Sequence, residues 1–265
     1  GTTWTMLQAD LAATLYDVEF SSCGASRCIW TVGTNGAIVY ASYANSGDIP
    51  NWATQNSGTT ATLYGIDRAP ATGNLRISGS GVILLTSNYG TSWSQIQDGS
   101  MTQTFQSLGI FSGGIYTVGS SGIIYRGTQI ESNWTWSTEN SNTSQGLNSL
   151  ALQSSPVLTV WAVGGGGTIV RYDETAPTSP TNLTKTTADT DNTPTFTWSA
   201  SSDDVSGTIG SGSITYQYSL DGSAIYTGAG SNTSATVVIP SLSNGSHTIS
   251  VRAVDAANNY SELAT

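Results

Sequence analysis

The chain has 265 residues, and its 17 acidic side chains outnumber its 7 basic ones, for a net charge of −10. This balance argues against nucleic-acid partners, whose phosphates require a cationic surface, and against anionic membrane surfaces. Ordinary hydrophobicity with few charged residues indicates folded domains. The sequence has neither the apolar periodicity of long helices nor an apolar run long enough for a membrane span, so neither is predicted.

The first 173 residues repeat one phrase, a small-residue turn between two short apolar runs. The four copies lie at residues 30–42, 76–87, 116–128 and 161–173. The glycines that mark them recur every 40 to 46 residues, at Gly33, Gly79, Gly119 and Gly164. Tight hairpin turns use positive φ, which glycine adopts without strain, so each phrase predicts a hairpin.

Two further strands accompany each phrase. An alternating run precedes it, at residues 15–20, 63–68, 105–110 and 147–152, and a tryptophan strand carries Trp4, Trp52, Trp93 or Trp134. Four strands in a unit of this length match one blade of a β-propeller. We expect one tryptophan per unit to pack between blades.

The phase of the repeats predicts a closed ring. A tryptophan strand precedes the first unit and none follows the last, so the strand around Trp4 can complete the blade that ends near Tyr172. This closure removes an open sheet edge. The alternative is part of a larger propeller with further blades upstream.

The sequence changes character at Asp173, where a proline-containing linker begins. Short strand-like runs follow at residues 195–200, 213–221, 235–240 and 247–255, with hairpin dipeptides at Asp221-Gly222 and Asn244-Gly245. We therefore predict an all-β chain: a four-bladed propeller over residues 1–173 and an immunoglobulin-like β-sandwich over residues 174–265.

Two family resemblances accompany this division. The phrases PTFTWSASSDD, YQYSLDG and LSNGSHTISVRAVDAANNYS resemble bacterial immunoglobulin-like or fibronectin-III-like modules of secreted proteins. The VGxxGxI phrases resemble the photosystem II assembly factor. The segment TSNYGTSW is similar to the Asp box of sialidase-type propellers, with Asn88 in place of the usual aspartate.

The residues favour no catalytic set. No motif anchors an arginine triad of the sialidase kind among Arg68, Arg76, Arg126 and Arg171, and Arg126 and Arg171 occupy equivalent repeat positions. The only histidine, His247, is expected on a strand of the sandwich. An exposed strand residue is a simpler interpretation of it than the base of a serine triad. We expect a protein that is not an enzyme and has no cofactor, with calcium binding left as an open alternative.

Calcium has two candidate sites. Asp17, Glu19 and Asp67 alternate along the first strands of two repeats, which the resemblance places at the central channel, where solvation is the alternative. Asp203, Asp204, Asp255 and Asn258 fall in loops of the sandwich, where ordinary turn chemistry is the alternative.

Two further pairs bear on location and binding. Cys23 and Cys28 flank a four-residue loop, and a disulfide there would place the chain in an oxidising compartment, two reduced thiols being the alternative. Trp134 and Trp136 point to one face of a strand and could stack on sugars, and Trp136 lies outside the once-per-repeat pattern.

These observations predict a secreted or cell-surface, non-enzymatic structural or adhesive protein. Its propeller would be an interaction or assembly platform that binds other subunits, as in an extracellular filament or surface layer. The alternative is a glycan-binding ancillary module of a carbohydrate-active enzyme.

Overall fold

A computed structural model describes residues 11–23, 26–44, 51–69, 74–154, 158–203, 214–223, 227–231 and 235–265. The chain forms two compact units, Gly1–Tyr172 and Asp173–Thr265, whose boundary lies within one residue of the predicted one. Apart from three single-turn 3-10 segments in the first unit, the described regular structure consists of β-strands, so the all-β class is confirmed.

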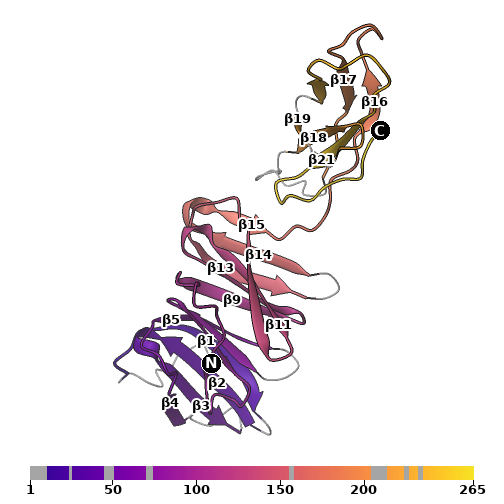
Figure 1. The fold of residues 1–265 in the computed structure, drawn as a ribbon. Helices are drawn as coiled ribbons and strands as arrows, with labels where there is room; N and C mark the ends of the chain where they lie inside the picture. Colours follow the sequence, from indigo (N-terminus) through magenta and orange to yellow (C-terminus); the bar gives the residue numbers. More distant parts are fainter. Residues whose placement is uncertain are drawn as a thin grey trace, which may run out of the picture. The chain divides into compact units, whose positions relative to one another are not determined.

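The first unit contains four antiparallel sheets, each built from strands consecutive in the chain (Figure 1). The first three sheets have four strands and the described part of the last has three. Their strands are β1 (Leu15–Cys23), β2 (Ser26–Gly33), β3 (Ile38–Tyr43) and β4 (Asn51–Gln55); β5 (Leu63–Arg68), β6 (Leu75–Gly79), β7 (Val82–Thr86) and β8 (Ser94–Gln95); β9 (Phe105–Phe111), β10 (Gly114–Gly119), β11 (Ile124–Ile130) and β12 (Asn133–Glu139); and β13 (Leu147–Gln153), β14 (Thr159–Gly164) and β15 (Ile169–Arg171).

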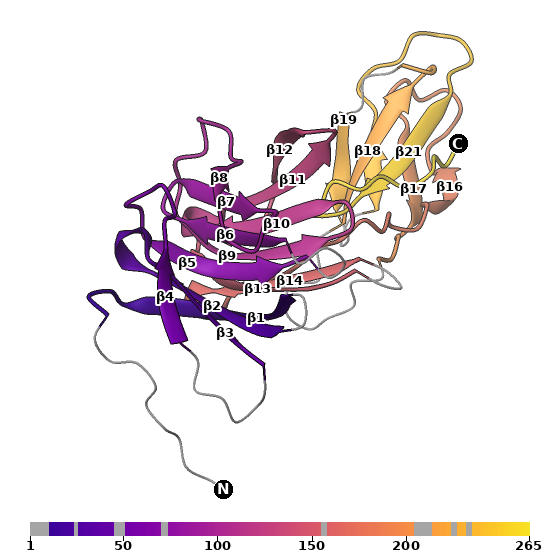
Figure 2. The same cartoon turned by 90° about the horizontal axis from the view of Figure 1, so that it is seen from below.

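The sheets pack face to face in chain order. The opening strand of each sheet contacts the opening strand of the next, from β1 to β5, β9 and β13 (Figure 2). Apolar side chains fill each junction: Trp30 and Val32 of the first sheet pack with Ile66 and Ile77 of the second. The hydrophobic effect thus stabilises the unit through a series of similar inter-sheet cores.

The glycine that ends each turn has the predicted positive φ. Gly36, Gly81, Gly122 and Gly167 have φ between 65° and 75°. In the first phrase, Asn35 also has positive φ and the Ala37 N–H donates to Thr34 O over 3.1 Å. Two successive positive φ values match a type I′ hairpin turn, which suits the twist of the two joined strands.

The first glycine of each phrase has a different role from the one predicted. Gly33, Gly119 and Gly164 have extended φ values of −168°, −171° and −159°. A Cβ on Gly119 would lie only 1.9 Å from the backbone oxygen of Thr104. The N–H of the next residue, Ser120, donates to that same oxygen over 3.0 Å. The repeat therefore requires glycine for close backbone approach, not for its turn conformation.

The strand register corrects the predicted alignment of the tryptophans. Trp52 pairs with Ala41, and Trp136 pairs with Gly127, at corresponding places of the first and third sheets. Trp136, and not Trp134, is therefore the counterpart of Trp52. Trp4 lies outside the described residues, so its pairing with the last sheet, and with it the closed ring, stays a prediction.

The Asp-box-like loop after β7 shows how asparagine replaces aspartate. The Asn88 Oδ1 accepts hydrogen bonds from the Thr86 hydroxyl and from the Ser92 N–H, at 2.8 and 3.0 Å. Its Nδ2 donates to the Ser92 hydroxyl over 2.9 Å. The amide thus keeps the accepting role that a carboxylate would have and adds one donor.

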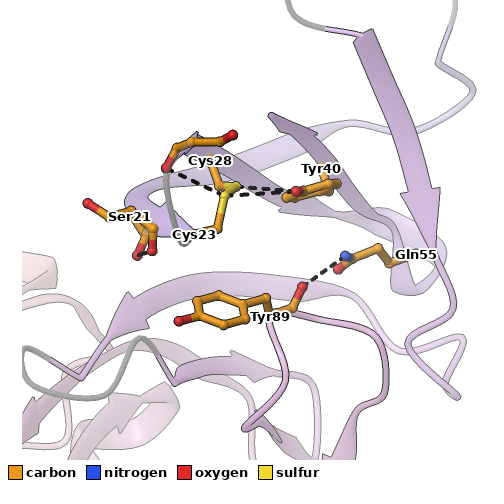
Figure 3. The surroundings of a disulfide bond; sticks show 8 residues. Ser21, Cys23, Cys28, Tyr40, Gln55 and Tyr89 are labelled. Carbon is orange, nitrogen blue, oxygen red and sulfur yellow. Dashed lines mark hydrogen bonds between the residues drawn. A yellow bond between two sulfur atoms is a disulfide. The ribbon is translucent and has the colours of Figure 1, made fainter. Parts of the chain in front are cut away.

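A disulfide joins Cys23 and Cys28 across the β1–β2 hairpin, as predicted (Figure 3). Cys28 is fully buried, and its sulfur lies 3.2 Å from the hydroxyl of Tyr40 on β3. The bond fixes the end of the hairpin against the rest of the first sheet.

Removing this bond with a Cys23→Ala/Cys28→Ala double variant should lower the free energy of unfolding by about 2 kcal/mol, because the bond closes only a short loop in the unfolded chain. Chemical denaturation of both proteins measures the difference. An equal loss on adding reductant to the wild type, with no further loss in the variant, shows that the bond itself is responsible. Unchanged stability in both experiments contradicts this expectation.

The second unit has two three-stranded sheets around a shared core. One has the order β16–β17–β20 and the other β19–β18–β21. Trp198 of the first and Tyr216 of the second meet edge to face, with ring centroids 5.1 Å apart. The strands are β16 (Thr181–Lys185), β17 (Thr195–Ser199), β18 (Thr215–Leu220), β19 (Thr227–Ser231), β20 (Thr236–Val238) and β21 (Ile249–Val254).

The two predicted hairpin dipeptides differ in outcome. Asp221 and Gly222 have φ values of 51° and 71° and form the turn after β18. Asn244 and Gly245 instead lie between β20 and β21, which belong to different sheets and do not pair. His247 is accordingly in the loop before β21 and not on a strand, which corrects the sequence prediction.

Candidate functional site

The sheet stack of the first unit ends in two apolar faces. Directly paired residues of antiparallel strands point to the same side, so Val18 and Phe20 share one face of the first sheet with their partners Thr31 and Ile29. This leading face points away from the second sheet, and Val18 and Phe20 are 60% and 48% exposed. Within the described residues, no sheet precedes β1 to cover these apolar side chains.

The last sheet has an exposed apolar face on the other end of the stack. Trp161, Val163 and Ile169 lie on one side, together with Ser149, and form the trailing face. Trp161 is 44% exposed, although its counterparts Trp30 and Tyr116 in the first and third sheets are at most 1% exposed. Neither face is among the sites predicted from the sequence, although the repeat alignment contains the signal. Positions that are buried in the inner copies recur, exposed, in the first and last copies.

A hydrogen bond accompanies each junction between opening strands. The Asp17 Oδ2 accepts from the Ile66 N–H over 2.9 Å, and the Ser107 hydroxyl accepts from the Leu150 N–H over 3.2 Å. Asp17 and Ser107 occupy the same repeat position. In the second sheet this position is Gly65, and Asp67, two residues later, accepts from the next strand instead.

These hydrogen bonds engage the carboxylates of the first predicted calcium set. Asp17 and Asp67 each bind backbone N–H groups through both carboxylate oxygens, and Glu19 pairs with Arg68 at 3.7 Å. Burial, followed by the Asp67 charge, raises the pKa of Glu19 above its usual value. Within the described residues these three carboxylates do not form a cluster of metal-ligand dimensions. Their geometry supports inter-sheet hydrogen bonding rather than calcium coordination.

The arginines are distributed among separate packing contacts. Arg76 is 6% exposed and its guanidinium lies 5.5 Å from the ring centre of Trp134. Burial lowers the pKa of Arg76, with the Asp67 charge opposing the shift. Arg126 instead lies over the ring of Phe111 at 5.7 Å. These positions stabilise the stack through cation–π contacts.

The predicted sugar-stacking pair lies between sheets. Trp134 and Trp136 are half-buried and stack with ring centres 5.9 Å apart. The Trp136 Nε1 donates to the backbone oxygen of Ile96, beside β8 of the second sheet, over 2.9 Å. The packing role that the sequence predicts for Trp134 therefore applies to Trp136 as well.

The second predicted calcium set is partly assembled in the second unit. Asp203 and Asp255 come together with Asp173, with carboxylate oxygens all within 4.8 Å. Asp204 lies outside the described residues. Asn258 contributes its N–H to the backbone oxygen of Asp255 over 3.3 Å. Asp173 is not among the predicted residues, because it lies thirty positions before Asp203, the first predicted residue of this set.

Asn259 organises this acidic cluster. Its backbone N–H and its Nδ2 donate to the two carboxylate oxygens of Asp255, at 2.8 and 2.9 Å. Its Nδ2 also lies within 3.3 Å of the backbone oxygens of Asp173 and Thr175. Three converging carboxylates are hard oxygen donors of the kind that calcium prefers, so the donor set fits the predicted cation.

Calcium addition tests this sequence prediction. At a concentration a hundred times its dissociation constant, calcium should stabilise the unit that binds it by about 2.7 kcal/mol. We expect the thermal transition of the wild type to rise with calcium and fall with a chelator, and that of Asp203→Asn to respond to neither. Asp189→Asn, an exposed position of the same unit, is the matched control. A calcium-independent transition in the wild type contradicts the prediction.

His247 makes the contacts of a catalytic triad in outline only. Its Nδ1 lies 2.8 Å from the Asp221 carboxylate, and its Nε2 lies 3.3 Å from the Ser243 hydroxyl. However, Nε2 is closer, at 3.0 Å, to the backbone oxygen of Ser243, which can only accept. Nε2 therefore carries a proton in this arrangement and is not positioned as a base for the serine.

These contacts predict the titration of the only histidine. The hydrogen bond to Asp221 is the main cause that raises the pKa of His247, and the same bond lowers the pKa of Asp221. The histidine contribution to stability is complete below its ordinary pKa of about 6.5 and is lost as the pH rises through the higher folded value. That of Asp221 is present above about 3.9 and is lost as the pH falls through the lower folded value.

NMR titration of the His247 ring protons should give a midpoint above 6.5 in the wild type, and Asp221→Asn should bring it down. The melting temperature of the second unit should fall between pH 6 and pH 9, and His247→Gln should remove that dependence. An unshifted wild-type midpoint would show that the pair does not form in solution.

A hollow beside the disulfide lies between the first two sheets. It is lined by Tyr40 and Gln55 of the first sheet and by Asn88 and Tyr89 of the Asp-box-like loop. The Gln55 amide donates to the backbone oxygen of Tyr89 over 3.4 Å (Figure 3). Tyr89 is 44% exposed and has a φ of 56°, which is uncommon for a bulky residue. The lining combines aromatic rings with neutral hydrogen-bonding groups.

Comparison with known proteins returns structural likeness alone. No family model and no curated protein matches the chain. Among solved structures, the chain is similar to the extracellular domain of BT4673 from B. thetaiotaomicron, in two crystal structures. Both likenesses have 14% sequence identity, cover 89% of this chain and have a TM-score of 0.41. The chain spans about a third, 34%, of the length of those chains.

The described helical segments are short. In that part of the chain, no helix combines the length and the apolar composition needed to cross a bilayer.

Proposed function

We propose that the chain is a secreted or cell-surface, non-enzymatic structural or adhesive protein. Its four consecutive sheets would be blades of a β-propeller that acts as an assembly platform, and the sandwich would be an immunoglobulin-like spacer or second contact. The exposed leading and trailing faces carry this proposal, because apolar patches at such places mark interaction surfaces.

Two further observations support an extracellular role. The Cys23–Cys28 disulfide fits an oxidising compartment, in which such bonds persist. The net charge of −10 with only 9% charged residues leaves a surface with many neutral polar groups. Physiological salt screens charges beyond about 8 Å, so the net charge of each copy does not prevent contact between apolar faces at short range.

Electron microscopy of the purified chain over a range of concentrations tests this function. We expect ordered rings or filaments that become more abundant as the concentration rises. Separate single particles at every concentration, with one unchanging sedimentation coefficient, would contradict an assembly role.

Glycan binding is the second candidate function. The hollow beside the disulfide is a better place for a glycan than the Trp134–Trp136 pair, which packs between sheets. Aromatic faces and neutral amides are suited to sugar rings, which are both apolar and hydroxylated. Screening on a glycan array should then give signals that Tyr89→Ala abolishes and Trp136→Phe retains. An array with no signal for the wild type would exclude this candidate.

A further inference from the structure

We propose that the trailing face of one chain docks on the leading face of a second copy, so that the series of sheets continues from one molecule into the next. This inference rests on the proposed assembly function and names the partner and the contact. Within the described residues, the two faces are the uncovered halves of a junction that the chain itself builds three times.

The junction between the third and fourth sheets shows which residues should meet. There, Val118 packs in one core with Leu147 and Leu150 of the next sheet. By the strand register, Val118 corresponds to Val163 on the trailing face, and Leu150 corresponds to Val18 on the leading face. Val163 of one copy is therefore expected opposite Val18 of the next.

Burial at the inner junctions indicates how complete the contact should be. The counterparts of Val163, which are Val32, Ser78 and Val118, are fully buried, whereas Val163 itself is 45% exposed. On the other side, Ile66 and Leu108 are 6% exposed where their counterpart Val18 is 60% exposed. A second copy would remove from water the surface that the inner junctions bury, and this provides the driving force.

The two faces also carry the counterparts of the polar groups that meet at the inner junctions. In two of the three inner junctions, the side chain of Asp17 or Ser107 accepts a hydrogen bond from the N–H of the fourth residue of the next opening strand. Ser149 occupies the accepting position on the trailing face and is exposed. The donor in the next copy would be the Val18 N–H, which in the single chain bonds to its own neighbour Asp17 over 2.8 Å.

The contact is head to tail, since two different faces of the same chain meet. Such contacts form closed rings when the rotation between copies closes and filaments when it does not. Two copies of four sheets would make eight, which is within the range of known propellers. Both rings and filaments contain the same Val163-to-Val18 junction.

Cross-linking between two variants, each with one added cysteine, tests the junction. A Val18→Cys chain is mixed with a Val163→Cys chain and treated with a bismaleimide whose span matches the roughly 10 Å between packed sheets. We expect covalent dimers in the mixture and none from either variant alone. The native disulfide does not react with maleimide and remains in place.

Two outcomes would overturn the proposal. One is the absence of dimers in the mixture. The other is a Val18→Cys/Val163→Cys chain that cross-links only within a single molecule, which would show closure by one chain. If the chain assembles in the microscope and the mixture still gives no dimers, this junction is wrong and the assembly function stands.

Sedimentation velocity adds a second readout. Val163→Asp places a carboxylate in the proposed contact, where burial without a partner should weaken association roughly a hundredfold. Val18→Asp should do the same, and Val238→Asp, at a 62% exposed position of the sandwich, should not. All three positions are exposed in the single chain, so circular dichroism should show the native fold. Equal association of all variants would contradict the proposed contact.

Discussion

Replacing Gly119 by alanine is expected to destabilise the protein by about 3 kcal/mol or more. The new Cβ would lie 1.9 Å from Thr104 O, a backbone atom that cannot turn away. To relieve the clash, β9 and β10 must separate where the Ser120 N–H bonds to that oxygen. Thermal and chemical denaturation of the variant measure the loss.

Gly99→Ala is the matched control for this substitution. A Cβ on Gly99 meets nothing within 4 Å, so the change should be neutral or slightly stabilising. If Gly119→Ala is as stable as Gly99→Ala, the close approach of the two strands is not required, and the explanation of the repeated first glycine is wrong.

Trp30→Ala should cost about 3–5 kcal/mol, whereas Trp161→Ala should cost less than about 1 kcal/mol in the dilute chain. The two tryptophans occupy the same place in the first and last sheets. Trp30 is fully buried against the second sheet, and Trp161 is 44% exposed on the trailing face. Truncating Trp30 therefore opens a cavity, and truncating Trp161 does not.

Denaturation curves at a concentration where the chain is monomeric give both values. Comparable losses for the two variants would show that Trp161 is covered within a single chain, as closure of a four-bladed ring requires. At concentrations where the wild type assembles, Trp161→Ala should also weaken association. Trp30→Ala tests folding stability alone, because Trp30 lies inside the chain and not on the trailing face.

The sequence predicts the repeating strands well, because their residues follow rules that act locally. The run at residues 63–68 coincides with β5, and that at residues 105–110 with all but the last residue of β9. Alternation sets which side chains are buried, and Asn35-Gly36 sets the turn. These features depend on neighbours in the chain and not on the arrangement of sheets.

The features that the sequence did not predict depend on distant contacts. Gly119 is explained by Thr104, the residue just before β9, and the true counterpart of Trp52 is visible only in the strand register. The Asn244-Gly245 dipeptide joins two different sheets, a choice that its local turn propensity does not determine. Asp173 likewise joins Asp203 only through the fold.

Oxidative footprinting of Trp161 tests the central claim that the stack ends in an open face which a second copy covers. Hydroxyl radicals modify exposed tryptophans, and mass spectrometry gives the modified fraction of each residue. We expect Trp161 to react in dilute protein and to become protected as the concentration rises, while Trp30 stays protected throughout. A Trp161 that is protected even in dilute protein, or that stays reactive in the assembled state, would contradict the account.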